Sequence, residues 1–151
     1  MIQIQRMAEM TTKSKWEGDD GMKEFIINQT QCKPYSGAGI CPRVKQKTTI
    51  LRSVDNTYYY ADNLNDVRNV KYTLFGHYGD QERTEKKFNK PLLDFEKSEN
   101  IYLYRVNPTA KNGKYTWYGK YKCTGEETVL HPDKDRKMRN IIVLNLTKVD
   151  V

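Results

Sequence analysis

The chain has 151 residues, which suits one domain with one core. Hydrophobic residues make up 37% of the sequence and charged residues 30%, so the chain is polar but not polar enough to be disordered. No apolar run reaches the length of a membrane span, and the opening segment MIQIQRMAEM lacks the apolar stretch of a secretory signal. We therefore expect a soluble intracellular protein with no membrane partner; the sequence does not distinguish nucleus from cytoplasm.

The charge balance favours a nucleic-acid partner. The 26 lysine and arginine residues outnumber the 19 aspartate and glutamate residues, for a net charge of +7. Such an excess attracts phosphate polymers, because counterions are released on binding. The three cysteines, Cys32, Cys41 and Cys123, have no Cys-x-x-Cys spacing. We expect reduced thiols rather than a disulfide framework or a zinc site.

In chain order, residues 1–22 are expected to form a flexible lead-in and residues 23–151 a single domain. Residues 33–43 are rich in Pro and Gly and predict a loop. Residues 82–95 predict the main helix, although Pro91 would kink it. Residues 132–139 predict a charged loop. β-Branched, aromatic or alternating residues predict strands at 48–54, 57–60, 70–75, 101–106, 115–123 and 140–146.

The segment 115–123 alternates most regularly. Alternation sends successive side chains to opposite faces of a sheet. One face is predicted to carry Tyr115, Trp117, Gly119, Tyr121 and Cys123, and the other Thr116, Tyr118, Lys120 and Lys122. Because the strands follow one another without helical crossovers, we predict an α+β, mainly β fold: an antiparallel sheet or small barrel with one main helix.

No set of residues predicts catalysis or a bound metal or cofactor. The two histidines, His77 and His131, are too few for an HNH-type metal site without other ligands. Pro132-Asp133 followed by Asp135-Arg136-Lys137 superficially resembles a nuclease pattern. Its acids are too close in sequence to lie on neighbouring strands around one metal, so we interpret it as a solvated charged turn. The chain is not expected to be an enzyme.

A binding site is easier to place. Tyr59, Asp62 and Tyr72 flank one short polar loop. Two tyrosine rings can sandwich a base, at about 1–3 kcal/mol per stacked base, and a carboxylate can accept a hydrogen bond from an exocyclic amine such as cytosine N4. The alternative is that both tyrosines are core aromatics on paired strands. Lysines that could contact phosphate are Lys86, Lys87, Lys90, Lys111 and Lys114.

The order of several short motifs resembles the SRA (SET and RING associated, or YDG) domain. The similarity is closest to the SRA-like domains of bacterial HNH modification-dependent restriction endonucleases. It covers roughly residues 37–149. Its motifs are Tyr59-x-x-Asp62, Tyr72-Thr73-x-x-Gly76, Asp80-Gln81, Asn89-Lys90-x-Leu92, Trp117-Tyr118-Gly119-Lys120-Tyr121, His131-Pro132-Asp133 and the final NIIVLNL.

This resemblance implies a PUA-like fold, with a curved sheet or small barrel, that recognises modified cytosine such as 5-methylcytosine in DNA by base flipping. It implies that Tyr59 and Tyr72 sandwich the base, that Asp62 reads its Watson–Crick edge, and that Thr73 and Gly76 belong to the pocket. Tyr118 stands where the family motif has Asp. The loop before Asp80 is too short for the finger that favours hemimethylated sites.

Several alternatives remain open at this point. One is a PUA-like RNA-binding module. A second is the DNA-recognition subunit of a modification-dependent restriction nuclease, working beside a separate nuclease or chromatin-type partner. A third is a protein-interaction domain that kept the fold and lost the pocket. Phosphorothioate DNA, which a related sulphur-binding domain recognises, is an alternative ligand.

Overall fold

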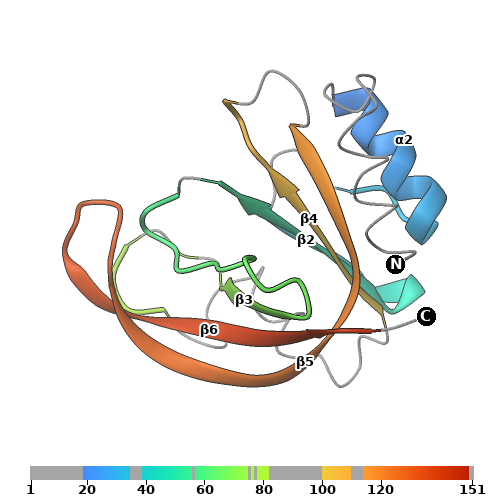
Figure 1. Ribbon diagram of the computed structural model, residues 1–151. Helices are drawn as coiled ribbons and strands as arrows, with labels where there is room; N and C mark the ends of the chain where they lie inside the picture. The colour runs from blue at the N-terminus through green and yellow to red at the C-terminus, as the bar shows by residue number, and fades with distance from the viewer. Residues whose placement is uncertain are drawn as a thin grey trace.

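The computed structural model describes residues 19–34, 39–55, 57–74, 76, 78–81, 100–109 and 114–149. Six strands in these ranges form one sheet in the order β1-β2-β4-β5-β6-β3. Figure 1 shows β5 curving so that its first half runs beside β4 and its second half beside β6. The elements are α2 (Asp19–Thr30), β1 (Ile40–Arg43), the 3-10 helix η2 (Val44–Gln46), β2 (Thr48–Val54), β3 (Asn69–Thr73), β4 (Asn100–Val106), β5 (Tyr115–Pro132) and β6 (Met138–Lys148).

The mainly β fold class is confirmed, but some elements differ from prediction. The strand predicted at 57–60 is wrong, because these residues form turns in which the Tyr60 N–H donates to the Thr57 carbonyl at 3.4 Å. Residues 40–43, expected within a loop, form β1. The sheet is not antiparallel throughout, since β2 and β4 are parallel. The predicted helix at 82–95 lies outside the described residues.

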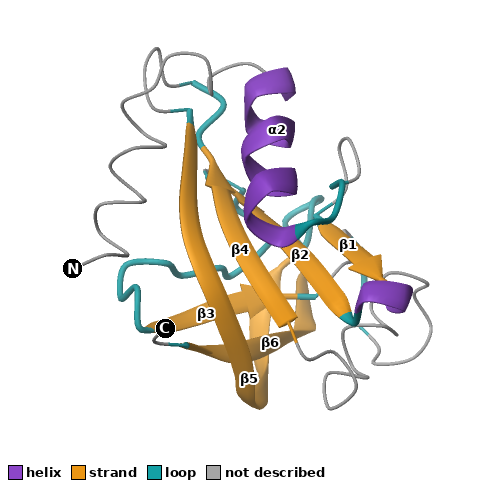
Figure 2. Ribbon diagram, turned by 90° about the vertical axis from the view of Figure 1, so that its right-hand side faces the viewer, coloured by secondary structure: helices purple, strands orange, loops and turns teal. Residues whose placement is uncertain are grey.

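The helix α2 begins inside the segment expected to be a lead-in. Its polar sequence carries one apolar group at helical spacing, Met22, Phe25 and Ile26, and all three side chains are buried. The rings of Phe25 and Trp117 pack edge to face with 5.6 Å between centroids. Figure 2 shows α2 lying along the strands β2 and β4. One short apolar stripe therefore docks the helix on the sheet.

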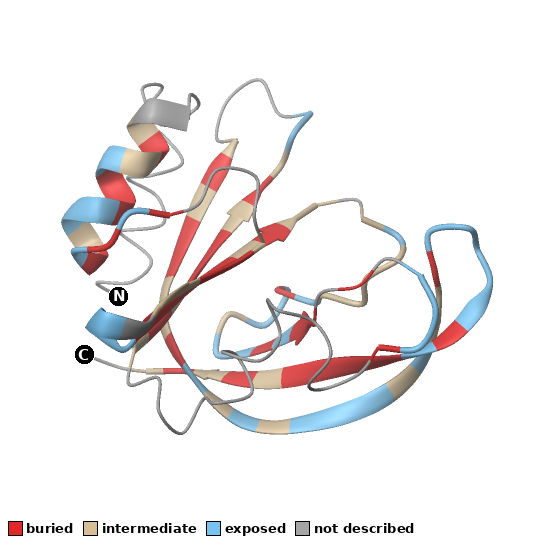
Figure 3. Ribbon diagram, turned by 180° about the vertical axis from the view of Figure 1, so that it is seen from behind, coloured by how far each residue is buried: buried red, intermediate tan, exposed pale blue. Residues whose placement is uncertain are grey.

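Two apolar clusters hold the sheet. One joins α2 to β2, β4 and the start of β5 and contains Ile26, Ile50, Tyr104 and Trp117. The other lies between β2, β3, β4, β5 and β6 and contains Leu51, Tyr72, Leu103, Tyr118 and Leu144. Figure 3 shows that β6 is largely buried, whereas the second half of β5 is mostly exposed. In the β5–β6 hairpin, β6 therefore packs on the core while the second half of β5 faces solvent.

The strict alternation predicted for 115–123 is wrong at Tyr118. The register between β4 and β5 shifts between Leu103 and Tyr104, so that Leu103 pairs with Gly119 and Tyr104 with Trp117. This bulge inserts one residue into β5 and changes which face the side chains occupy. Tyr118, predicted on the polar face, is buried with Tyr121 in the second cluster.

Gly119 makes this bulge possible. Its φ is +97°, a backbone conformation that favours glycine. We expect Gly119→Ala to lower the free energy of unfolding by about 1–3 kcal/mol, measured by urea denaturation. Gly125→Ala is the matched control on the same strand, because an added Cβ there would lie 3.5 Å from Asn145 Nδ2, an ordinary contact. Equal stability of the two variants would contradict this account of the bulge.

Candidate base-binding site

A cavity of about 360 Å³ lies between the β2 strand, the turn at 57–60 and β3. Four of the five predicted pocket residues line it: Tyr59, Asp62, Tyr72 and Thr73. Its volume falls within the range of small-ligand sites. The full lining is Gly39, Ile40, Arg52, Val54, Thr57, Tyr59, Tyr60, Asp62, Tyr72 and Thr73.

The Asp62 carboxylate accepts hydrogen bonds on both of its oxygens. The Ser53 hydroxyl donates to Oδ2 at 2.7 Å, and the Thr73 backbone N–H donates to Oδ1 at 2.7 Å. Burial raises the pKa of Asp62, and these hydrogen bonds oppose the rise. Each carboxylate oxygen has two lone pairs, so the group can accept further hydrogen bonds from a ligand.

Tyr72 belongs both to the core and to the cavity. Its side chain is buried, and its hydroxyl lies 2.9 Å from the Gly39 carbonyl and 3.1 Å from the Arg52 carbonyl, both acceptors for its proton. Burial raises the pKa of Tyr72 well above its usual value. The core role and the pocket role that the sequence left as alternatives are therefore compatible, because the buried ring also lines the cavity.

The three consecutive tyrosines form a connected aromatic wall. The Tyr59 ring lies 5.3 Å from that of Tyr58 and 4.9 Å from that of Tyr60, edge to face in both cases. The Tyr60 hydroxyl accepts a hydrogen bond from the Gly76 N–H at 3.3 Å. Burial raises the pKa of Tyr60 to about 12. Tyr60 lines the cavity but was not predicted, because nothing in the sequence distinguishes it from its neighbours.

Arg139 fixes the position of this wall, although residues 132–139 were predicted to be a charged loop. It lies in β6 and is buried. Its guanidinium donates to the carbonyls of Tyr59 at 2.8 Å, Gly76 at 2.8 Å and Gly79 at 3.1 Å. Burial lowers the pKa of Arg139. Because it joins distant segments through carbonyls alone, Arg139 gives no local sequence signal.

Gly76, the fifth predicted pocket residue, supports the site from outside the cavity. Its carbonyl accepts from Arg139 and, at 3.2 Å, from Gln81 Nε2. Gln81 also donates to the Leu74 carbonyl and accepts from the Ile142 N–H. Asp80 Oδ1 accepts from the Asn140 N–H at 2.7 Å. The Asp80-Gln81 motif therefore ties the segment after β3 to β6.

A second, more open cavity of about 700 Å³ adjoins the first. Val54, Thr57, Tyr60 and Asp62 line both cavities, so Asp62 stands between them. Elsewhere the lining includes the ion pair of Arg105 with Asp55 and the ring of His131. The rest of the wall combines the polar side chains of Ser53, Asn63 and Asn65 with apolar ones.

Of the lysines predicted to contact phosphate, only Lys114 lies within the described residues. Its Nζ lies 5.4 Å from the centroid of the Tyr115 ring, at the start of β5 and outside both cavity linings. Four other predicted lysines are outside the described residues: Lys86, Lys87, Lys90 and Lys111. His77 is outside them as well.

The turn between β5 and β6 is built around Asp133. Its Oδ1 accepts from the N–H groups of Asp135 at 2.8 Å and Lys137 at 2.9 Å. Asp133 is thus a turn-forming residue, while residues 134–137 are exposed. In the described part of the chain, no group of three or more His, Cys, Asp or Glu side chains could hold a metal ion. No described helix is long and apolar enough to cross a membrane.

Several solved structures have a fold similar to that of this chain, and two of them are described as SRA domains. The chain is similar to the sulfur binding domain and SRA domain of ScoMcrA complexed with phosphorothioated DNA, with a TM-score of 0.63 and 15% identity over 89% of this chain and 38% of that chain. It is similar to MspJI restriction endonuclease in complex with a 27-mer oligonucleotide, with a TM-score of 0.59 and 18% identity over 78% and 34% of the two chains. The SUVH5 SRA complex with methylated CHH DNA gives a TM-score of 0.56 and 15% identity over 85% and 84%. The fold is that of an SRA domain.

The family model described as "ScoMcrA-like, SRA domain" matches residues 32–151. The chain belongs to this family, and the resemblance inferred from motif order is confirmed. No curated protein matches the chain. The chain spans about two fifths of the ScoMcrA structure and about a third of the MspJI structure.

Proposed function

We propose that this SRA domain binds DNA and recognises a modified cytosine that is flipped out of the duplex into the 360 Å³ cavity. The observation that carries the proposal is the convergence of Tyr59, Asp62, Tyr72 and Thr73 on that cavity. In this proposal the tyrosine rings stack on the base and Asp62 accepts a hydrogen bond from its exocyclic amine. The fixed carboxylate supports this role, because it needs no reorganisation on binding.

The test is binding of the purified chain to one DNA duplex that carries cytosine, 5-methylcytosine or 5-hydroxymethylcytosine, followed by fluorescence anisotropy at moderate salt. We expect at least a tenfold preference for one modified duplex, about 1.4 kcal/mol. Equal affinity for all three, falling steeply with salt, would contradict base recognition and leave a phosphate-driven binder. Matched RNA and phosphorothioate DNA are further arms, and preference for either would replace modified cytosine as the ligand.

The raised pKa of Asp62 predicts two opposite effects of acid. Because the folded-state pKa lies above the usual 3.8, the folded chain binds a proton that the unfolded chain lacks over the interval between those values. The free energy of unfolding should therefore rise as pH falls through this interval, relative to Asp62→Asn. Base discrimination should fall over the same interval, because a protonated carboxyl offers a weaker acceptor.

Both effects are measured in parallel, by urea denaturation and by anisotropy between pH 7 and pH 4. The Asp62→Asn variant supplies the reference for each. If the free energy of unfolding changes with pH in the same way in the wild type and in Asp62→Asn, Asp62 is not the group that causes the pH dependence. Asp62 would also be excluded if base discrimination fell with pH while the difference in unfolding free energy between the wild type and Asp62→Asn stayed constant.

A further inference from the structure

The end of the β5–β6 hairpin, residues Asp133–Lys137, is fixed against the wall of the base cavity. The Tyr58 hydroxyl donates to the Lys134 carbonyl at 2.6 Å, and His131 Nε2 lies 2.7 Å from the Tyr58 carbonyl. Both contacts join the hairpin to the turn that carries Tyr59. Since Asp133 also holds the turn in shape, the hairpin end has a defined form and a defined place beside the cavity.

This hairpin end presents three cations to solvent. Lys134, Arg136 and Lys137 are exposed, against one exposed acid, Asp135. Lys134 Nζ lies 5.7 Å from the centroid of the Tyr59 ring, and the Arg136 guanidinium lies 4.5 Å from that of Tyr58. Contact with an aromatic face positions a cation without neutralising its charge.

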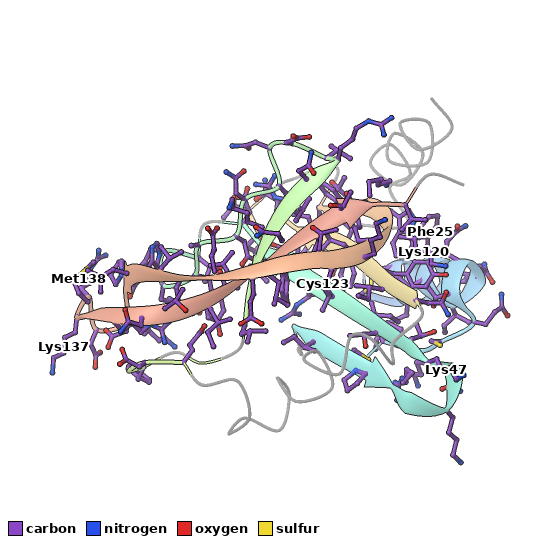
Figure 4. The ribbon with its side chains drawn as sticks, turned by 90° about the horizontal axis from the view of Figure 1, so that it is seen from below. Phe25, Lys47, Lys120, Cys123, Lys137 and Met138 are labelled. Atoms are coloured by element: carbon purple, nitrogen blue, oxygen red, sulfur yellow. The ribbon has the colours of Figure 1, made fainter. Side chains whose placement is uncertain are left out.

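The middle of the hairpin carries the opposite charge to its end. Farther along β5, the exposed side chains Glu126 and Glu127 are acidic. Figure 4 shows Lys137 at the end of the hairpin, at the opposite extreme of the molecule from Lys47. The two exposed cations that lie over the Tyr59 and Tyr58 rings, Lys134 and Arg136, therefore belong to one short turn.

We propose that Lys134, Arg136 and Lys137 bind backbone phosphates of duplex DNA next to the nucleotide in the cavity. The inference rests on the proposed function, and it adds a phosphate-binding element that the sequence did not indicate. A flipped nucleotide stays attached to its strand, so the adjacent phosphates must lie near the cavity entrance. Cations placed one aromatic ring from the cavity can reach those phosphates and set the register of the duplex.

The test is a triple variant, Lys134→Gln, Arg136→Asn and Lys137→Gln, measured beside the wild-type chain. Arg136 is replaced by asparagine because its backbone φ is +66°, a conformation that asparagine adopts more readily than most residues. The control triple variant, Lys23→Gln, Lys33→Gln and Lys45→Gln, removes the same charge from α2, the turn after it and η2. Affinity for the modified and unmodified duplexes is measured from about 50 to 200 mM salt.

The hairpin variant should bind both duplexes about tenfold or more weakly near 100 mM salt, and the slope of log affinity against log salt should fall by about 2–3. The preference for the modified base should be unchanged, and the control variant should match wild type. A hairpin variant with wild-type affinity and slope would overturn the proposal even if wild type prefers modified DNA. A wild-type chain that shows no preference, with a reduced slope in the hairpin variant, would instead overturn base recognition and support the hairpin contacts.

Discussion

Replacing Asp62 with asparagine is expected to abolish the distinction between modified and unmodified DNA while leaving salt-dependent binding in place. Asparagine keeps one carbonyl oxygen that can accept the Thr73 N–H but replaces the other oxygen with a donor. The ligand's amine then meets a donor in place of an acceptor. Hydrogen bonds to charged groups contribute about 1.5–3 kcal/mol, so we expect a loss of roughly 10- to 150-fold in affinity for the preferred duplex.

The measurement compares the affinities for the modified and unmodified duplexes, using the same anisotropy assay. Asp66→Asn is the matched control, because Asp66 is exposed and lines neither cavity; asparagine can keep the hydrogen bond that Oδ1 accepts from the Arg68 N–H and loses only a long one, at 3.4 Å, from Asn69 Nδ2. Full discrimination in Asp62→Asn would exclude the carboxylate as the group that recognises the base. Loss of discrimination in both variants would point to net charge instead.

Replacing Arg139 with methionine is expected to produce the largest loss of stability among the site residues. Methionine fills a similar space but leaves the carbonyls of Tyr59, Gly76 and Gly79 without their guanidinium donor. An unsatisfied buried polar group costs about 1–3 kcal/mol. Water can reach the carbonyl of the exposed Gly79, and the Gly76 carbonyl keeps its hydrogen bond from Gln81 Nε2, so we expect a total loss of about 1–3 kcal/mol in the free energy of unfolding.

Urea denaturation measures this loss. Lys137→Met is the control, because Lys137 is exposed, lies two residues before Arg139, and loses one positive charge in the same substitution. Arg139→Lys should recover only part of the stability, because one ammonium cannot reproduce the planar donor geometry of arginine. Base discrimination in the folded Arg139→Met protein should also fall, since Tyr59 loses a main-chain anchor. Wild-type stability in Arg139→Met would contradict the role assigned to these hydrogen bonds.

The strands at 48–54 and 101–106 could be predicted because their sequence signals are local. The grouping of Tyr59, Asp62, Tyr72 and Thr73 could be predicted from short motifs. Alternation and β-branched residues define strands locally, and motif order carried the resemblance to the SRA family. The predictions that failed depend on tertiary contacts. The bulge that buries Tyr118 depends on the pairing of β5 with β4. The helix α2 has only a short apolar stripe, and this stripe packs on the sheet at Trp117.

The missing site residues have the same explanation. Arg139 looks like part of a charged loop, because its partners lie 60 to 80 residues earlier in the chain and are carbonyls, which every residue possesses. Tyr60 is one of three identical neighbours. Lys134, Arg136 and Lys137 form a short basic turn whose position beside Tyr59 becomes evident only when β5 and β6 are paired.

The order of strands in the sheet also bears on when the cavity can exist during folding. The pairing of β5 with β6 joins neighbours in the chain, as does the pairing of β1 with β2. By contrast, β3 pairs with β6 across 70 to 78 residues, and β2 pairs with β4 across about 50. Distant pairings carry the larger loop-closure entropy. The 360 Å³ cavity lies between β2 and β3, so it depends on these distant closures and forms only after the β1–β2 pair and the β5–β6 hairpin have been brought together.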